Sequence, residues 1–144
     1  MAIYFYGSTD EYGCFSNFSR HGIAMEDGYW PTVEHYFQAQ KFNDLQHRER
    51  IRRASTPKEA KRLGWSRAIP IRADWEEIKE EVMRRAVRRK FETHAAIREL
   101  LLSTGDEEIV ENASGDYYWG SGKNRLGVIL MEVRAWLRNL PVSG

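Results

Sequence analysis

The sequence is poor in cysteine and histidine and has no long apolar run. Its single cysteine, Cys14, cannot form a disulfide within the chain. The four histidines are scattered without CxxC or HExxH spacing, so we expect no metal site. No segment is apolar enough to span a membrane, and the first six residues do not resemble a secretory signal. These absences predict a cytoplasmic protein, and we expect it to need no cofactor.

An excess of one charge is also missing. The chain has 22 Lys and Arg against 21 Asp and Glu, a net charge of +1, which argues against a general nucleic-acid binder. Its 144 residues, 42% hydrophobic and 30% charged, fit one folded domain over residues 1–144. Aromatic residues stand out, with five Trp, seven Tyr and six Phe.

Hydrophobic periodicity and turn signals predict mixed secondary structure. Strands are expected at 2–6 and 107–111, and the Asp-Gly pair at 27–28 predicts a two-stranded ribbon within 22–30. Helices are expected at 34–42, 45–54, from 57 to about 64, at 74–92, 94–103 and from about 125 onward. We therefore predict an α+β fold, a helix-rich single domain with a small antiparallel sheet.

Charges of each sign cluster in two places. Residues 84–90 carry four arginines and Lys90, whereas residues 99–116 carry six acids and no base. The simpler interpretation is a solvated helix face and a polar loop. The alternative is a basic rim that attracts a phosphorylated or nucleotide ligand.

Three polar residues share one side of the predicted helix 34–42. Glu34 and Lys41 are seven residues apart, so they point in nearly the same direction, with Gln38 between them. Burying a carboxylate, an amide and an amine together is costly without a purpose. An exposed polar row remains the alternative, because such spacing is common on helix surfaces.

Two loops could contribute to a binding pocket. The glycine-rich segment 112–127 precedes the last helix, where main-chain N–H groups with Lys123 and Arg125 could hold a phosphate; a capped turn is the alternative. The segment 12–18 alternates aromatic and polar residues, as in a wall that stacks a planar ring, or it faces the core. Trp75 is either a core residue or a stacking platform. Cys14 has no His or acid partner pattern, which disfavours a thiol nucleophile.

Several strings taken together are similar to one known family. They are Phe-Ser-Asn-Phe at 15–18, Trp-Pro-Thr-Val-Glu-His-Tyr-Phe-Gln-Ala-Gln-Lys-Phe at 30–42, Asp-Trp at 74–75, Tyr-Trp-Gly at 118–120 and Gly-Lys-Asn-Arg-Leu-Gly at 122–127. The sequence resembles the YbiA-like N-glycosidases, also called the NADAR domain, from about Ile3 to Leu137. The combination is specific, although no single string is.

The resemblance implies hydrolysis of the bond between ribose and a nitrogenous base. One substrate class in such families is the ribosylamino-pyrimidine 5′-phosphates, which are reactive intermediates of riboflavin biosynthesis. The other is ADP-ribose attached to guanine in DNA or RNA. Both branches share the motifs, so the motifs do not choose between the two substrates.

The resemblance also implies roles for individual residues. Glu34 corresponds to a catalytic acid or base, Lys41 to an amine that forms a Schiff base in the ADP-ribose branch, and Asp116 to a second acid. The remaining residues expected to bind substrate are Phe15, Asn17, Trp75, Tyr118, Trp119, Gly120, Lys123, Asn124 and Arg125. Some members insert extra glycines in the loop at 120–123, at the phosphate end of the pocket, and this chain does not.

Three hypotheses follow. The first is an N-glycosidase of ribosylamino-pyrimidine phosphates, in which Glu34 and Asp116 flank one sugar carbon, as two carboxylates do in most glycosidases. The second keeps the reaction but acts on ADP-ribosyl-guanine in nucleic acid. The third is a non-catalytic module that binds ADP-ribose or a nucleotide, for which Glu34→Gln would leave binding unchanged.

Overall fold

The structure, a computed structural model of residues 1–144, describes all of them except 1, 6, 8–9, 113–115 and 141–144. Helices and short strands both occur in the described residues, which confirms the α+β class. Two compact units can be distinguished. One comprises Asn17–Lys90, here called the central unit. The other comprises Met1–Ser16 with Phe91–Gly144, here called the terminal unit.

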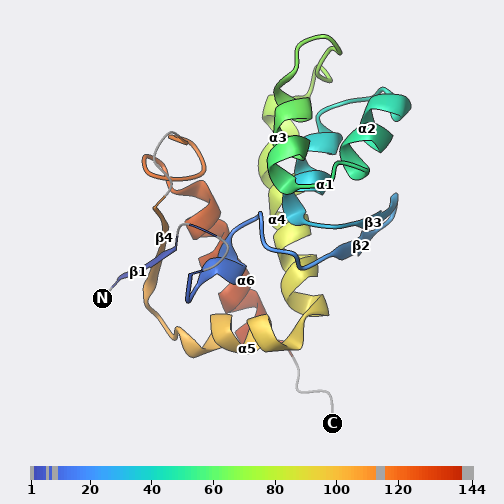
Figure 1. Cartoon of the computed structure of the whole chain (residues 1–144). Coiled ribbons are helices and arrows are strands. Elements are labelled where there is room, and N and C mark those ends of the chain that lie inside the picture. Colours follow the sequence, from blue (N-terminus) through green and yellow to red (C-terminus); the bar gives the residue numbers. More distant parts are fainter. Residues whose placement is uncertain (1, 6, 8–9, 113–115, 141–144) are drawn as a thin grey trace. The chain divides into compact units, whose positions relative to one another are not determined.

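The central unit contains three short helices. They are α1 (Val33–Gln40), α2 (Leu45–Arg52) and α3 (Pro57–Trp65), which contact one another, and α4 (Trp75–Thr93) follows them (Figure 1). Each of the three begins at a side-chain cap: Thr32, Asp44 and Thr56 accept the N–H of the residue three positions later at 2.8–3.1 Å. These caps satisfy N–H groups that a helix start leaves unpaired. Thr32 and the proline at the first position of α3 are the start signals predicted from the sequence.

A two-stranded ribbon lies beside these helices, as predicted. Strands β2 (Ile23–Met25) and β3 (Gly28–Trp30) pair antiparallel. Gly28 takes a φ of +119°, a conformation open to glycine and strained for other residues.

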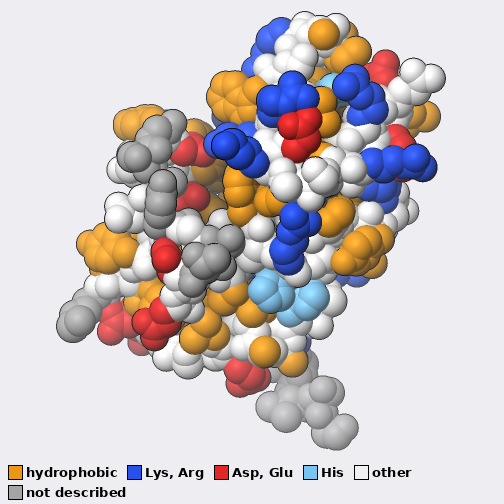
Figure 2. Space-filling view, viewed as in Figure 1, with side chains coloured by type: hydrophobic (Ala, Val, Ile, Leu, Met, Phe, Trp, Pro, Cys, Tyr) orange, Lys and Arg blue, Asp and Glu red, His pale blue; other side chains and the backbone are white. Residues whose placement is uncertain are grey.

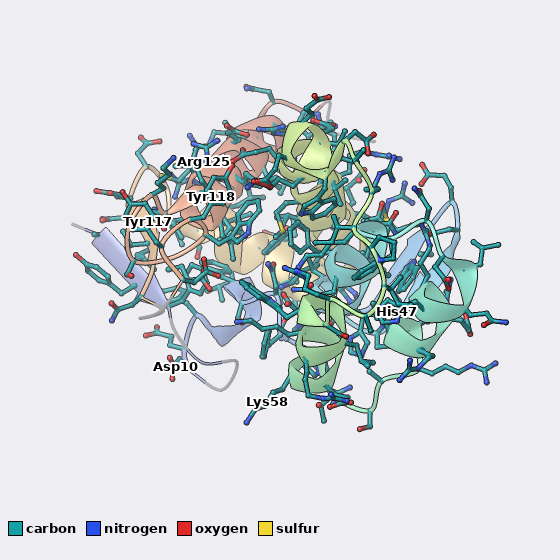
Figure 3. All side chains as sticks on the ribbon, turned by 90° about the horizontal axis from the view of Figure 1, so that it is seen from above. Asp10, His47, Lys58, Tyr117, Tyr118 and Arg125 are labelled. Atoms are coloured by element: carbon teal, nitrogen blue, oxygen red, sulfur yellow. The ribbon has the colours of Figure 1, made fainter. Side chains whose placement is uncertain are left out.

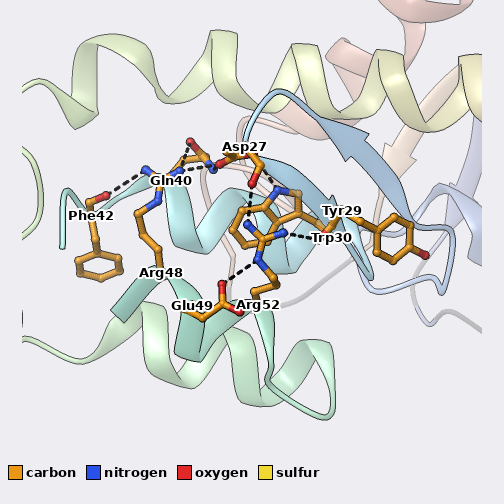
Figure 4. Close-up of polar contacts among 8 residues, drawn as sticks. All are labelled: Asp27, Tyr29, Trp30, Gln40, Phe42, Arg48, Glu49 and Arg52. Carbon is orange, nitrogen blue, oxygen red and sulfur yellow. Dashed lines mark hydrogen bonds and ion pairs between the residues drawn. The ribbon is translucent and has the colours of Figure 1, made fainter. Parts of the chain in front are cut away.

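One arginine of α2 holds the ribbon (Figure 4). Arg52 donates to the carbonyls of Asp27 and Tyr29 at 2.7 and 2.6 Å, and its guanidinium lies 4.0 Å from the Trp30 ring centroid. Asp27 accepts from Trp30 Nε1 and from Arg48. These contacts fix the ribbon immediately before α1 begins.

The terminal unit contains a second strand pair. Strands β1 (Ala2–Phe5) and β4 (Glu108–Glu111) pair in parallel, with Ala2 opposite Glu108. Both strands were predicted, but the predicted antiparallel arrangement applies only to the ribbon. The parallel pairing joins segments about a hundred residues apart, so no local turn signal announces it.

Helices α5 (Ala95–Ser103) and α6 (Arg125–Arg138) complete this unit, and α6 packs against β4 (Figure 1). A Cβ on Gly127 would lie 2.2 Å from the carbonyl oxygen of Ile109, so glycine permits this close approach. A short 3₁₀ helix at Gly13–Phe15, which the sequence did not predict, precedes the central unit.

The basic run in α4 is not a continuous exposed rim. Arg84 pairs with Glu81 at 2.9 Å, Arg85 pairs with Glu26, and Lys90 is buried. These contacts favour the interpretation of a helix face with internal charge pairing. Among the described residues, no helix is long and apolar enough to cross a membrane.

Candidate active site

The predicted polar row on α1 is buried. Glu34, Gln38 and Lys41 expose only 7%, 4% and 6% of their surfaces. The sequence left open an exposed helix face, and the structure excludes it. Helix α1 is enclosed by the elements packed around it, so its polar residues face the protein interior together with its aromatic ones.

Gln38 holds the carboxylate of Glu34. Its Nε2 donates to Glu34 Oε2 at 2.8 Å, one helical turn away. On the other side, a Cβ on Gly64 would lie 2.0 Å from Gln38 Oε1, so only a residue without a side chain fits there. Gln38 Oε1 is buried and accepts no hydrogen bond from any described residue. A hydrogen-bonded carboxylate thus lies beside a buried amide oxygen that has no described hydrogen-bond partner.

Lys41 is a buried amine at the end of α1. Burial lowers the pKa of Lys41 from 10.5 to about 8; the negative charge of Glu34 opposes the decrease, and the positive charges of Arg67 and Lys61 add to it. Its Nζ lies 5.1 Å from the Trp65 ring centroid, and no described residue forms an ion pair with it. About a tenth of such an amine is neutral at pH 7. A neutral amine can act as a nucleophile.

Asn17 and Trp75 lie next to α1. The main-chain carbonyl of Asn17 accepts the N–H of Glu34 at 3.1 Å, which places Asn17 at the start of the helix. Its Nδ2 contacts Met83 Sδ, while its buried Oδ1 has no hydrogen-bond partner in the described structure. Trp75 is buried against Phe37 with ring centroids 5.0 Å apart, so it serves as a core residue, and its contact with a substrate base stays a prediction.

Asp116 organises the loop that precedes α6. Its Oδ1 accepts the N–H of Trp119 at 2.9 Å, and its carbonyl accepts that of Gly120. The rings of Tyr118 and Trp119 meet edge to face, 4.7 Å apart. The capped turn that the sequence left as an alternative is therefore present, and it fixes the Asp116 carboxylate.

The residues expected at a phosphate lie in the same loop, where Figure 3 labels Tyr117, Tyr118 and Arg125. Lys123 is exposed, with its Nζ 5.6 Å from the Tyr118 ring centroid. Asn124 adopts a left-handed conformation, with a φ of 52°. Both polar atoms of its side-chain amide form hydrogen bonds with β4: Oδ1 accepts from the N–H of Glu111, and Nδ2 donates to the carbonyl of Ile109. Asn124 thus connects this loop to the sheet.

Phe15 lies in the core of the terminal unit. It is 1% exposed and contacts the rings of Phe5, Tyr12 and Phe91 at centroid distances of 5.5–6.0 Å. For this residue the structure favours the core-facing alternative. Its contact with a substrate base stays a prediction.

The sequence profile of the NADAR domain matches residues 4–138. The chain belongs to the NADAR domain family. It is 52% identical to N-glycosidase YbiA of Escherichia coli over 94% of this chain and 88% of that protein. It is also 52% identical to N-glycosidase Npun_R5314 of Nostoc punctiforme, over 97% and 95% of the two chains.

A solved structure and a longer plant protein are also similar to this chain. The NMR structure of E. coli YbiA superimposes with a TM-score of 0.88 at 51% identity, covering 96% of this chain and 85% of that one. The chloroplastic riboflavin biosynthesis protein PYRR of Zea mays is 42% identical over 92% of this chain, which corresponds to 25% of that longer protein. The predicted family is confirmed.

The structure brings together part of the predicted NADAR site. Glu34, Lys41, Asn17 and Trp75 all belong to the central unit, whereas Asp116 and the residues at 118–125 belong to the terminal unit. The proposition that Glu34 and Asp116 flank one sugar carbon stays a prediction. In the part of the chain that the structure describes, no group of three or more His, Cys, Asp or Glu could hold a metal ion.

Sequence reasoning missed three residues beside Lys41 and Gln38. Gly64 permits the position of Gln38, Trp65 contacts Lys41, and Arg67 lies over the same indole ring. Gly64 was interpreted only as the end of a helix. The available signal was the Trp-Ser-Arg string at 65–67, at the end of a predicted helix that carries Lys58, Lys61 and Arg62.

Proposed function

We propose that this protein is an N-glycosidase that hydrolyses the ribose–nitrogen bond of ribosylamino-pyrimidine 5′-phosphates, the reactive intermediates of riboflavin biosynthesis. The observation that carries the proposal is the buried Glu34–Gln38 pair beside the desolvated amine of Lys41. The names of the relatives, N-glycosidases and a riboflavin biosynthesis protein, support the reaction and the substrate class.

The chemistry follows from the charge that develops during cleavage. As the C1′–N bond breaks, positive charge grows on C1′, and the electron pair leaves with the nitrogen. A carboxylate fixed in advance stabilises that charge without having to reorganise. We assign this role to Glu34, which Gln38 orients. Water then adds its hydroxyl to C1′, its proton passes to Glu34, and the nitrogen of the departing base receives a proton.

The other predicted residues complete the proposal. Asp116 acts as the second acid, which protonates the leaving nitrogen. Trp75 and Trp119, with Phe15 and Tyr118, contact the base, and Asn17 reads its polar edge. The loop before α6 also contacts the substrate, through Gly120, Lys123, Asn124 and Arg125. We propose a cytoplasmic location.

The test is product formation. Purified protein is incubated with 5-amino-6-ribosylaminouracil 5′-phosphate, and ribose 5-phosphate and the free pyrimidine are quantified against a buffer blank. We expect equimolar release of the two products. No release above spontaneous breakdown, while a control N-glycosidase is active on the same substrate, would reject the proposal.

A second substrate is favoured by one observation. The lowered pKa of Lys41 suits a Schiff base with an opened ribose, which is the chemistry of the ADP-ribosyl-guanine branch. Arg84 and Arg85 of α4 pair with acidic residues, which argues against this helix as a binding surface for a long nucleic acid. Incubation with an ADP-ribosylated oligonucleotide and borohydride separates the cases. Guanine leaves with the oligonucleotide, so reduction of the Schiff base leaves ADP-ribose on the protein, and an ADP-ribose mass adduct that Lys41→Met abolishes supports the second substrate. Binding without turnover of either substrate, unchanged in Glu34→Gln, supports a non-catalytic module.

A further inference from the structure

The segment after α3 places a second cation beside Lys41. Ser66 ends the helix in an extended conformation, and the guanidinium of Arg67 lies 5.8 Å from the Trp65 ring centroid. Lys41 Nζ lies 5.1 Å from the same centroid. One indole ring, 59% exposed, therefore contacts two positive groups, one buried at the site and one on the surface.

Arg67 uses only one of its nitrogens within the described structure. Its Nη1 donates to the carbonyls of Gly64 and Trp65, at 3.4 and 3.2 Å, which are unpaired groups at the end of α3. Its Nε and Nη2 bond to no described residue, and no described carboxylate pairs with Arg67. The Nε–Nη2 edge is one that can bind two phosphate or carboxylate oxygens in parallel.

The surroundings of Arg67 add further positive charge. Lys61 precedes Trp65 by one helical turn on α3, so it lies on the same side of the helix. The positive charges of Lys61 and Arg67 both lower the pKa of Lys41, so both residues act electrostatically on the site. By contrast, Arg62 on the same helix is exposed and paired with Glu59 at 2.5 Å. On the face drawn in Figure 2, Lys and Arg side chains are frequent over the part that α2 and α3 form.

We propose that Arg67, held against Trp65 and assisted by Lys61, binds the 5′-phosphate of the ribosyl group whose C1′ reacts at Glu34, in place of Lys123 and Arg125, which the sequence predicts for that role. The proposal rests on the proposed function, and a 5′-phosphate on the ribose is common to both substrate classes. Capping of α3 uses Nη1 of Arg67 and leaves its Nε–Nη2 edge without a partner among the described residues. Repulsion among three nearby cations is unfavourable, and a bound dianion relieves it.

The test measures binding of ribose 5-phosphate and of ribose, which lacks the phosphate and is mainly a pyranose in water; the difference in ring form is the same for every variant. Calorimetric titration of both sugars into the wild type, Arg67→Ala, Arg67→Lys and Arg62→Ala gives a ratio of dissociation constants for each protein. We expect the wild type to prefer ribose 5-phosphate and Arg67→Ala to reduce that preference about tenfold or more. Arg67→Lys retains part of it, because the charge remains without the planar fork, and Arg62→Ala retains all of it.

The ratio isolates the phosphate contact. Removing Arg67 also raises the pKa of Lys41, but the added positive charge favours the phosphate, so it cannot produce the expected loss of preference. An unchanged ratio in folded Arg67→Ala would overturn the proposal, as would a wild type with no preference. Loss of the preference in Lys123→Ala with retention in Arg67→Ala would assign the phosphate to the loop before α6 instead.

Failure of this proposal can be told apart from failure of the proposed function, because binding needs no turnover. A phosphate preference that depends on Arg67 in a protein without N-glycosidase activity rejects the function and keeps the subsite. Turnover with a phosphate preference independent of Arg67 does the reverse.

Discussion

Replacement of Lys41 by methionine should stabilise the protein while abolishing Schiff-base chemistry. Burial lowers the pKa of Lys41 from 10.5 to about 8, and at about 1.4 kcal/mol per pKa unit this corresponds to roughly 3 kcal/mol of unfavourable charge burial. Methionine is similar in length and uncharged. That figure already includes the attraction of Glu34, and methionine must repack where the amine lay, so we expect a gain in unfolding free energy of about 1–3 kcal/mol at pH 7.

The pH dependence gives the sharper test. A lysine whose pKa is lowered on folding holds its proton more weakly in the native state, so the unfolded chain binds more protons and the wild type gains stability as pH rises. The stability advantage of Lys41→Met should therefore be greatest below pH 8 and decline to nearly zero by pH 10.5. Urea unfolding of both proteins at pH 7, 9 and 10.5 measures this difference.

An exposed lysine provides the matched control. Lys58 on α3 lies on the surface, away from α1 (Figure 3), and Lys58→Met should change stability little at every pH. If Lys41→Met is less stable than the wild type at pH 7, or if its advantage does not decline between pH 8 and 10.5, the amine is not a desolvated cation and the reasoning fails.

Two other substitutions test the geometry of the site. Gly64→Ala puts a Cβ 2.0 Å from Gln38 Oε1, so we expect kcat to fall about tenfold or more and stability by about 1–3 kcal/mol. Gly7→Ala, whose new Cβ has no atom of the described residues within 4 Å, should change neither. Asp116→Asn keeps an oxygen that can accept the Trp119 N–H, so it should retain wild-type thermal stability and lose activity, while Asp116→Ala should lose both. Equal activity in Gly64→Ala and the wild type, or an active Asp116→Asn, would contradict these assignments.

Much of the fold could be predicted because its signals are local. Thr32 caps α1, Pro57 begins α3, and the glycine of the Asp-Gly pair turns the ribbon with a positive φ, each as the sequence indicated. The 3₁₀ helix at Gly13–Phe15 and the parallel pairing of β1 with β4 could not be predicted, because neither has a periodic or turn signature of its own.

The site shows the same division. Spacing placed Glu34, Gln38 and Lys41 on one side of a helix, but it could not show whether that side is buried, because burial depends on what packs against the helix. The fit of Gln38 against Gly64 and the shared contact of Lys41 and Arg67 with Trp65 join α1 to α3 and its following residues. Such contacts depend on tertiary packing, and sequence spacing does not record them.

The role of Glu34 is the central claim, and a comparison of Glu34→Gln with the wild type tests it most directly. Single-turnover release of ribose 5-phosphate from the ribosylaminouracil phosphate is measured at equal protein concentration, with circular dichroism to confirm the fold. We predict that Glu34→Gln reduces the rate by about 10²–10⁴. A folded Glu34→Gln that releases ribose 5-phosphate at more than half the wild-type rate would contradict the account.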